Sequence, residues 1–100
     1  MADVTIVPLS EENVQLFSQT AAKILPEAWS FETYQKQLSN PDDISFLALC
    51  NGEAAGFISV WCVCGEAEIN NIGVVEKFRR MGIAKALFDS AYNAAKAEKW

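Results

Sequence analysis

The chain has 100 residues, of which 51% are hydrophobic, and it carries a formal net charge of −5. This length suits one small domain, and this apolar content is enough for a packed core, so the composition excludes an intrinsically disordered protein. We therefore predict a single domain over residues 1–100.

The sequence shows no membrane or secretion signal. No apolar run approaches the roughly 18–20 residues that a membrane-spanning helix needs, and Met1-Ala2-Asp3 does not begin a signal peptide. The three cysteines Cys50, Cys62 and Cys64 lie in apolar, strand-like runs, and their odd number argues against a disulfide framework. The chain has no histidine and no second cysteine pair, so we predict no metal site. The lack of a membrane-spanning run and of a signal peptide, together with the cysteine pattern, predicts a cytoplasmic protein that binds no membrane.

Charge is unevenly distributed along the chain. Residues 1–76 hold eleven acids and two lysines, giving −9, whereas residues 77–100 hold six bases and two acids, giving +4. Because the surface is so acidic, we predict that the protein does not bind nucleic acid. We expect it to bind a small anion near the basic segment.

The N-terminal quarter predicts a strand followed by a helix. Residues 3–8 have a strand pattern. Ser10 is predicted to cap the helix, with Glu11 and Glu12 in its first turn, where the helix dipole favours acids. Pro26 ends the helix.

The middle of the chain predicts a second helix and then a hairpin. The helix begins after a cap at Ser30 and is closed by Asn40-Pro41. Strands are predicted at residues 44–50 and 53–63, because Asn51-Gly52 between them tolerates the positive φ of a type I′ turn.

The last third predicts a strand and a long helix. Gly65 marks a turn, residues 66–75 form the next antiparallel strand, and apolar residues recur with helical spacing from Ile83 to about Lys96. The order β-α-α-β-β-β-α gives a mixed α/β (α+β) fold, with an antiparallel meander and one helix packed across it.

The join between this last strand and helix is the richest stretch for chemistry. Half of the basic residues lie within residues 77–85, and Gly82 stands at the helix start. Unpaired N–H groups in the first helical turn, together with these bases, favour a phosphate-like anion, and a pyrophosphate fits best. The simpler interpretation is an ordinary glycine turn beside a solvated basic face. The P-loop and G-x-G-x-x-G patterns are absent.

Three segments of the chain resemble the GNAT N-acetyltransferases. Arg79-Arg80-Met81-Gly82-Ile83-Ala84 is similar to the Q/R-x-x-G-x-G/A signature that cradles the pyrophosphate of acetyl-CoA. EAEINNIGVVEKF, at residues 66–78, resembles the fourth strand and loop of the branch that acetylates ribosomal-protein alanine. AWSFETYQKQL, at residues 28–38, resembles the start of that branch's second helix.

The resemblance implies an acyl-CoA N-acyltransferase fold and a role as an acetyl-CoA-dependent N-acetyltransferase. The acceptor it implies is an amine, above all a protein N-terminal α-amine. The residues that it assigns to the coenzyme are Ile72, Gly73, Val74, Arg79, Arg80, Met81, Gly82, Ile83, Ala84 and Lys85.

Candidate catalytic carboxylates lie on the strand at residues 66–75. By period two, Glu66, Glu68, Asn70 and Ile72 should share one face. Glu68 is the first candidate for the general base and Glu66 the second, while the simpler interpretation is that both are solvated. In the branch resembled, the base lies on a fifth strand and the acid is a tyrosine of a fourth helix, and this sequence ends before both.

Substrate contacts are predicted at Trp29 and Tyr34, although aromatic residues at helical spacing are more often core. An acidic groove that includes Asp42 and Asp43 besides the two glutamates would favour cationic amines.

The resemblance covers the chain but only about two-thirds of the usual domain, so we expect a C-terminally incomplete domain. The strand edge at residues 69–75 would then be unpaired, which predicts self-association. Two alternatives stay open: an inactive acetyltransferase-like fragment that binds CoA or a protein partner, and an interaction domain in which Gly82 only makes a turn.

Overall fold

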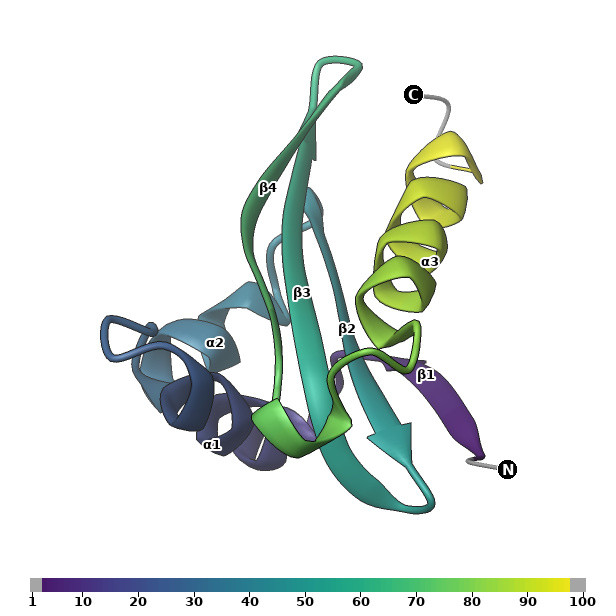
Figure 1. Cartoon of the computed structure of the whole chain (residues 1–100). Coiled ribbons are helices and arrows are strands. Elements are labelled where there is room, and N and C mark those ends of the chain that lie inside the picture. The colour runs from purple at the N-terminus through teal and green to yellow at the C-terminus, as the bar shows by residue number, and fades with distance from the viewer. Residues whose placement is uncertain (1–2, 98–100) are drawn as a thin grey trace.

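The computed structural model describes residues 3–97, which form a four-stranded antiparallel sheet with helices on both faces (Figure 1). The strands lie in chain order, β1-β2-β3-β4, so β1 and β4 are the edges. The elements are β1 (Val4–Pro8), α1 (Val14–Ile24), α2 (Phe31–Gln37), β2 (Asp43–Cys50), β3 (Glu53–Val63), β4 (Glu66–Val74), a 3-10 turn η1 (Glu76–Phe78) and α3 (Ile83–Ala97). This confirms the predicted order and the mixed α/β class.

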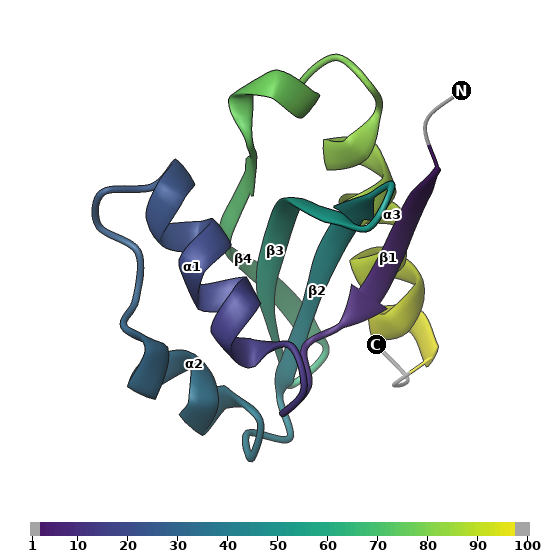
Figure 2. The ribbon, with the colours of Figure 1, turned by 90° about the horizontal axis from the view of Figure 1, so that it is seen from below.

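The helices divide the molecule into three layers. Helices α1 and α2 cover one face of the sheet and α3 covers the other (Figures 1 and 2). Strand residues alternate between the two cores: Phe57 packs with Phe17 and Tyr34 under α1 and α2, whereas Ile58 packs with Leu87 under α3. Within residues 3–97, no helix has the length and apolar content needed to cross a bilayer.

Two tight turns fix the register of the meander. Asn51 and Gly52 have φ of 53° and 84°, and Cys64 and Gly65 have 53° and 81°. Positive φ at both central residues is what a type I′ turn requires, so both predicted turns are confirmed. In the second turn the first left-handed residue is Cys64, where glycine or asparagine is more usual.

The start of α1 differs from the prediction. The helix begins at Val14 with Asn13 as its cap residue, so Ser10 is not the cap and the two glutamates precede the helix. The cause is a local turn: the Asn13 side chain accepts the N–H of Ser10 at 2.8 Å and donates to the Pro8 carbonyl at 2.9 Å. An asparagine that bonds nearby backbone in this way stabilises a turn in place of another helical turn.

The start of α2 follows the prediction. The hydroxyl of Ser30 accepts the N–H of Thr33 at 3.2 Å, which confirms the cap. Trp29, just before the cap, packs on Tyr34 with ring centroids 5.5 Å apart, the contact known as a hydrophobic staple.

A bulge in β4 overturns the predicted face of that strand. Val60 pairs with Ile69 but Ser59 pairs with Asn71, so Asn70 is an extra residue without a partner across the ladder. Period two therefore breaks at Asn70. Glu66 and Glu68 share the α1/α2 face with Asn71 and Gly73, whereas Ile72 lies on the opposite, α3 face with Ile69 and Val74.

Gly73 is explained by packing. A Cβ at this position would lie 2.7 Å from Cγ2 of Ile24, the last residue of α1. The bulge of β4 lies three residues earlier, at Asn70, so it does not account for the glycine. Gly73 lets α1 lie directly on β4.

We predict that Gly73→Ala lowers the free energy of unfolding by about 1–3 kcal/mol, because the new methyl overpacks against a stiff β-branched side chain. A glycine in a strand interior otherwise gains stability when it becomes alanine. Urea unfolding measures the change. In an Ile24→Ala background the cost of Gly73→Ala should fall toward zero, and an equal cost in both backgrounds would contradict the packing explanation.

Candidate functional site

The chain leaves β4 and enters α3 through a short loop with unusual backbone geometry. After η1, Arg80 and Gly82 have φ of 68° and 77°, both in the left-handed region. The carbonyl of Gly82 accepts the N–H of Ala86 at 3.0 Å, which is the first hydrogen bond of α3. The N–H groups of the three residues between them therefore have no partner within the helix and point out of its start.

An open hollow of about 410 Å³ lies at this helix start. Its lining brings together seven of the ten residues predicted to contact the coenzyme and adds Phe78, which was not among them. The residues that line the hollow are Val74, Phe78, Arg79, Arg80, Gly82, Ile83, Ala84 and Lys85. The space beside Gly82 is empty, since a Cβ there would meet no heavy atom within 4 Å. Glycine adopts the positive φ at position 82 without strain, and the approach to the backbone is open.

The charges around the hollow are partly compensated. Lys77 pairs with Glu53 at 2.8 Å and Lys85 with Asp89 at 2.7 Å, and Arg79 donates from Nε to the Val74 carbonyl at 3.3 Å. Both ion pairs are largely exposed, so each contributes little and its lysine remains able to turn toward an anion. Among residues 3–97, Arg80 has no acidic partner.

These features fit a diphosphate. Free N–H groups at a helix start supply hydrogen-bond donors, the helix dipole favours negative charge, and the surrounding bases add to the positive potential. The helix start and the basic side chains thus surround one hollow, which most of the predicted coenzyme residues line.

The remaining predicted coenzyme residues lie on or beside the same edge. Ile72 and Gly73 pair with Ile58 and Phe57 of β3 on one side, and within residues 3–97 no strand covers the other side of β4. An edge strand leaves alternate N–H and C=O groups unpaired, so β4 offers backbone donors next to the hollow. Met81 is exposed in the loop and does not line the hollow.

The predicted catalytic and substrate residues lie on the α1/α2 face. Glu66 and Glu68 are exposed near the β3–β4 turn, and Trp29 is half-buried before α2. Tyr34 is only 1% exposed and belongs to the core. Its hydroxyl makes no well-formed hydrogen bond. Burial raises the pKa of Tyr34, and the nearby backbone of Trp29 offsets only part of this rise. Contact between Tyr34 and an acceptor would need movement of the α1–α2 segment.

Trp61 is a residue of this face that sequence reasoning missed. It pairs with Glu68 across β3 and β4, its ring lies 5.7 Å from that of Trp29, and its Nε1 donates to Gln37 at 2.9 Å. The register of the hairpin around Cys64-Gly65 was the signal that could have placed Trp61 opposite Glu68.

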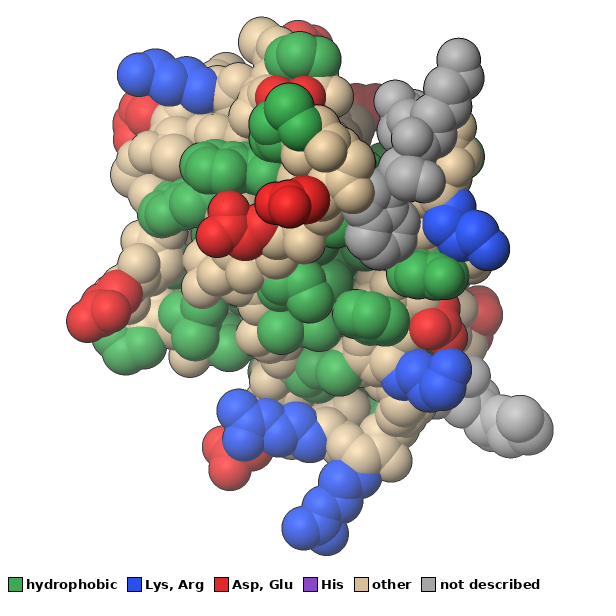
Figure 3. All heavy atoms as spheres, turned by 90° about the horizontal axis from the view of Figure 1, so that it is seen from above, with side chains coloured by type: hydrophobic (Ala, Val, Ile, Leu, Met, Phe, Trp, Pro, Cys, Tyr) green, Lys and Arg blue, Asp and Glu red, His purple; other side chains and the backbone are tan. Residues whose placement is uncertain are grey.

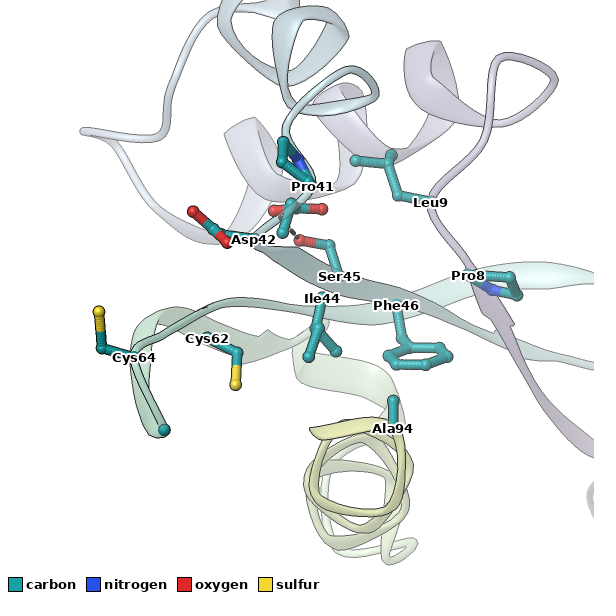
Figure 4. A pocket seen from close by; sticks show the side chains of 12 residues that line it. Pro8, Leu9, Pro41, Asp42, Ile44, Ser45, Phe46, Cys62, Cys64 and Ala94 are labelled. Carbon is teal, nitrogen blue, oxygen red and sulfur yellow. Dashed lines mark hydrogen bonds between the residues drawn. The ribbon is translucent and has the colours of Figure 1, made fainter. Parts of the chain in front are cut away.

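Asp42 and Asp43 line a different pocket, of about 410 Å³, at the other end of α3 (Figure 4). Ala94 lines this pocket, eleven residues or roughly 16 Å along the helix from Ile83, so neither aspartate reaches the hollow. Burial raises the pKa of Asp43 to about 6, opposed by a 2.8 Å hydrogen bond from Ser45. Because the folded state binds this proton more tightly, the contribution of Asp43 to stability declines as pH rises from about 4 to 6.

A sequence model described as the acetyltransferase (GNAT) family matches residues 11–99. Among curated proteins, a candidate ribosomal protein bS18-alanine N-acetyltransferase of Bacillus subtilis (strain 168) is 26% identical over 86 residues, covering 85% of this chain and 57% of that protein.

Solved structures share the fold. The ribosomal-protein-S18-alanine N-acetyltransferase of Escherichia coli superposes with a TM-score of 0.81 at 22% identity, covering 96% of this chain and 61% of its own. NAA60 of Arabidopsis thaliana in complex with acetyl-CoA gives 0.77 at 21% identity, covering 95% of this chain and 69% of its own. The chain thus spans about three-fifths of the length of these relatives.

Proposed function

This chain belongs to the acetyltransferase (GNAT) family, and from that premise we propose that it transfers the acetyl group of acetyl-CoA to a primary amine, most specifically a protein N-terminal α-amine. The observation that carries the proposal is the hollow at the start of α3, where free backbone N–H groups, Arg79 and Arg80 surround a space suited to the coenzyme diphosphate. The relatives named for alanine acetylation support the choice of acceptor.

The β4 edge supplies the second part of the coenzyme site. In the proposed complex, the outward backbone N–H groups of Ile72 and Val74 lie along the acyl arm. The N–H of Gly73, like that of Val75, points toward β3, because donors alternate between the two sides of a strand. A donor aimed at the thioester oxygen stabilises the oxyanion that develops when the amine attacks the carbonyl carbon. The thiolate of CoA then leaves and takes up a proton.

The amine must lose a proton before or during attack, so a general base is required. Glu68 is the proposed base and Glu66 the second candidate. Both are exposed, neither makes an ion pair among the described residues, and both lie on the face that carries Trp29.

Two measurements test this function. Calorimetric titration with acetyl-CoA should show saturable binding, and a thiol-release assay with an alanine-initiated peptide should show CoA formation that depends on the peptide's free amine. Binding without turnover would favour the alternative, an inactive CoA-binding module. No binding at all would contradict the proposed function.

We predict that Glu68→Gln lowers kcat/KM by about 10²-fold or more, because an amide cannot accept the proton of the attacking amine. Steady-state kinetics with an alanine-initiated peptide measure the effect. Glu66→Gln is the matched control on the same face and should cost less. A kcat/KM in Glu68→Gln equal to that of the wild type, or a loss no greater than in Glu66→Gln, removes Glu68 from the mechanism.

We also propose that the exposed β4 edge pairs with a second copy of the chain. Large hydrophobic side chains are exposed on the α3 side of β4 and along α3, including Ile69 and Phe88 at 45% and 46%. Viewed from above, hydrophobic side chains form a patch with acidic side chains to one side and basic ones to the other (Figure 3). Antiparallel pairing of two β4 edges would set the acidic start of one strand against the basic loop after the other.

Sedimentation velocity should therefore show a dimer that dissociates on dilution, and Phe88→Glu should shift it to monomer. Acetyl-CoA, which competes for the same edge, should also favour the monomer. A monomer at every concentration, with and without Phe88→Glu, would contradict the pairing.

A further inference from the structure

Trp61 links β3 to the end of α2. Its indole Nε1 donates to Oε1 of Gln37 at 2.9 Å, and the same oxygen accepts from Nδ2 of Asn40 at 3.1 Å. The two donors fix the orientation of the Gln37 amide. The last turn of α2 is thereby tied to β3 by a bond between side chains 24 residues apart.

Trp29 rests on Trp61 and extends the contact into the loop before α2. The two rings lie 5.7 Å apart at an interplanar angle of 30°, and Trp29 also contacts Tyr34 at 5.5 Å. Residues 25–30 have no helix or strand of their own, so this stacking and the Ser30 cap hold the loop in place.

Two carboxylates flank Trp61 on the same face of the sheet. The strand register pairs Trp61 with Asp43 of β2 on one side and with Glu68 of β4 on the other. Directly paired residues have Cβ atoms about 4.5–5.5 Å apart, so both carboxylates lie beside the indole. An aromatic wall next to carboxylates is the chemistry that recognises an ammonium group.

We propose that Trp61 is a positioning residue for the amine acceptor: through Gln37 and Trp29 it holds α2 and the loop before it beside the Glu68 end of β4, so that an ammonium group meets both indoles and the Glu68 carboxylate. This inference rests on the proposed function and names how its acceptor is held. It gives Trp61 no part in coenzyme binding, because the residues that line the diphosphate hollow run from the end of β4 into α3 and do not include Trp61.

A purely structural role for Trp61 makes a different prediction. If the indole only packed, loss of its hydrogen bond would lower stability and affect acceptor and coenzyme alike. Positioning instead predicts weaker acceptor binding with an unchanged affinity for acetyl-CoA.

The test uses the full chain and two glutamine variants. Gln37→Leu removes the acceptor of the indole bond, and Gln35→Leu makes the same change at an exposed position of the same helix. The probes are an alanine-initiated hexapeptide, titrated by calorimetry with saturating CoA, and acetyl-CoA alone. Gln37→Leu and Trp61→Phe should each raise the Kd for the peptide by about 5- to 10-fold, as expected for one hydrogen bond, and leave the Kd for acetyl-CoA within about twofold.

Controls separate positioning from folding. Gln35→Leu should change neither Kd, and Gln37→Glu, which keeps an oxygen to accept the indole N–H, should restore most of the peptide affinity. Circular dichroism checks that each variant is folded. If Gln37→Leu unfolds, the comparison uses Trp61→Phe in its place. The Nα-acetylated hexapeptide, which has no ammonium group, should bind more weakly than the free peptide and equally to wild type and Gln37→Leu.

The outcomes distinguish this inference from the function on which it rests. Suppose that the wild type binds acetyl-CoA and the peptide. If the variants then keep both affinities, or lose both in equal measure, the proposed function stands and the role of Trp61 is overturned. Wild type that binds acetyl-CoA but not the free peptide also overturns it. Wild type that does not bind acetyl-CoA contradicts the proposed function itself.

Discussion

The left-handed backbone at the entrance of α3 is the constraint on which the site depends. Positive φ at Arg80 and Gly82 reverses the chain between the end of β4 and the start of the helix. The reversal places the free N–H groups of the first helical turn, the loop bases and the β4 edge around one hollow. An L-residue with a side chain is strained in this region by about 1–2 kcal/mol. Arg80 bears this strain, and glycine at 82 avoids it.

The sheet separates two kinds of chemistry. The bulge at Asn70 turns Glu66 and Glu68 to the α1/α2 face and leaves Ile69 and Ile72 on the α3 face. Acidic and aromatic groups suited to an amine therefore gather on one side of β4. The edge of the same strand leads to the hollow at the start of α3.

Local signals were enough to predict most of the fold. Asn51-Gly52, the Ser30 cap and the spacing from Ile83 each determine a turn or an element within a few residues, so sequence and structure agree there. That the basic residues and the helix start meet at one place was predictable for the same reason, since most of the residues lining the hollow lie within a short stretch of the chain.

The errors arose where the structure depends on contacts that a single segment does not reveal. The start of α1 is decided by the Asn13 side chain bonding back to Ser10 and Pro8. The bulge at Asn70 is visible only in the pairing with β3, and the reason for Gly73 is Ile24 on another element. Trp61 gains its importance from Gln37 and Trp29, which no local pattern connects to it.

Backbone N–H groups at the start of α3 are the proposed ligands of the coenzyme diphosphate, and a pair of matched glycine variants tests this role most directly. Gly82 and Gly52 have φ of 77° and 84°, and a Cβ at either meets no atom within 4 Å, so alanine imposes a similar strain at both. Calorimetric titration with acetyl-CoA should show affinity about tenfold or more weaker in Gly82→Ala, which disturbs the helix entrance, and wild-type affinity in Gly52→Ala. Equal affinity in the wild type and both variants would contradict the account.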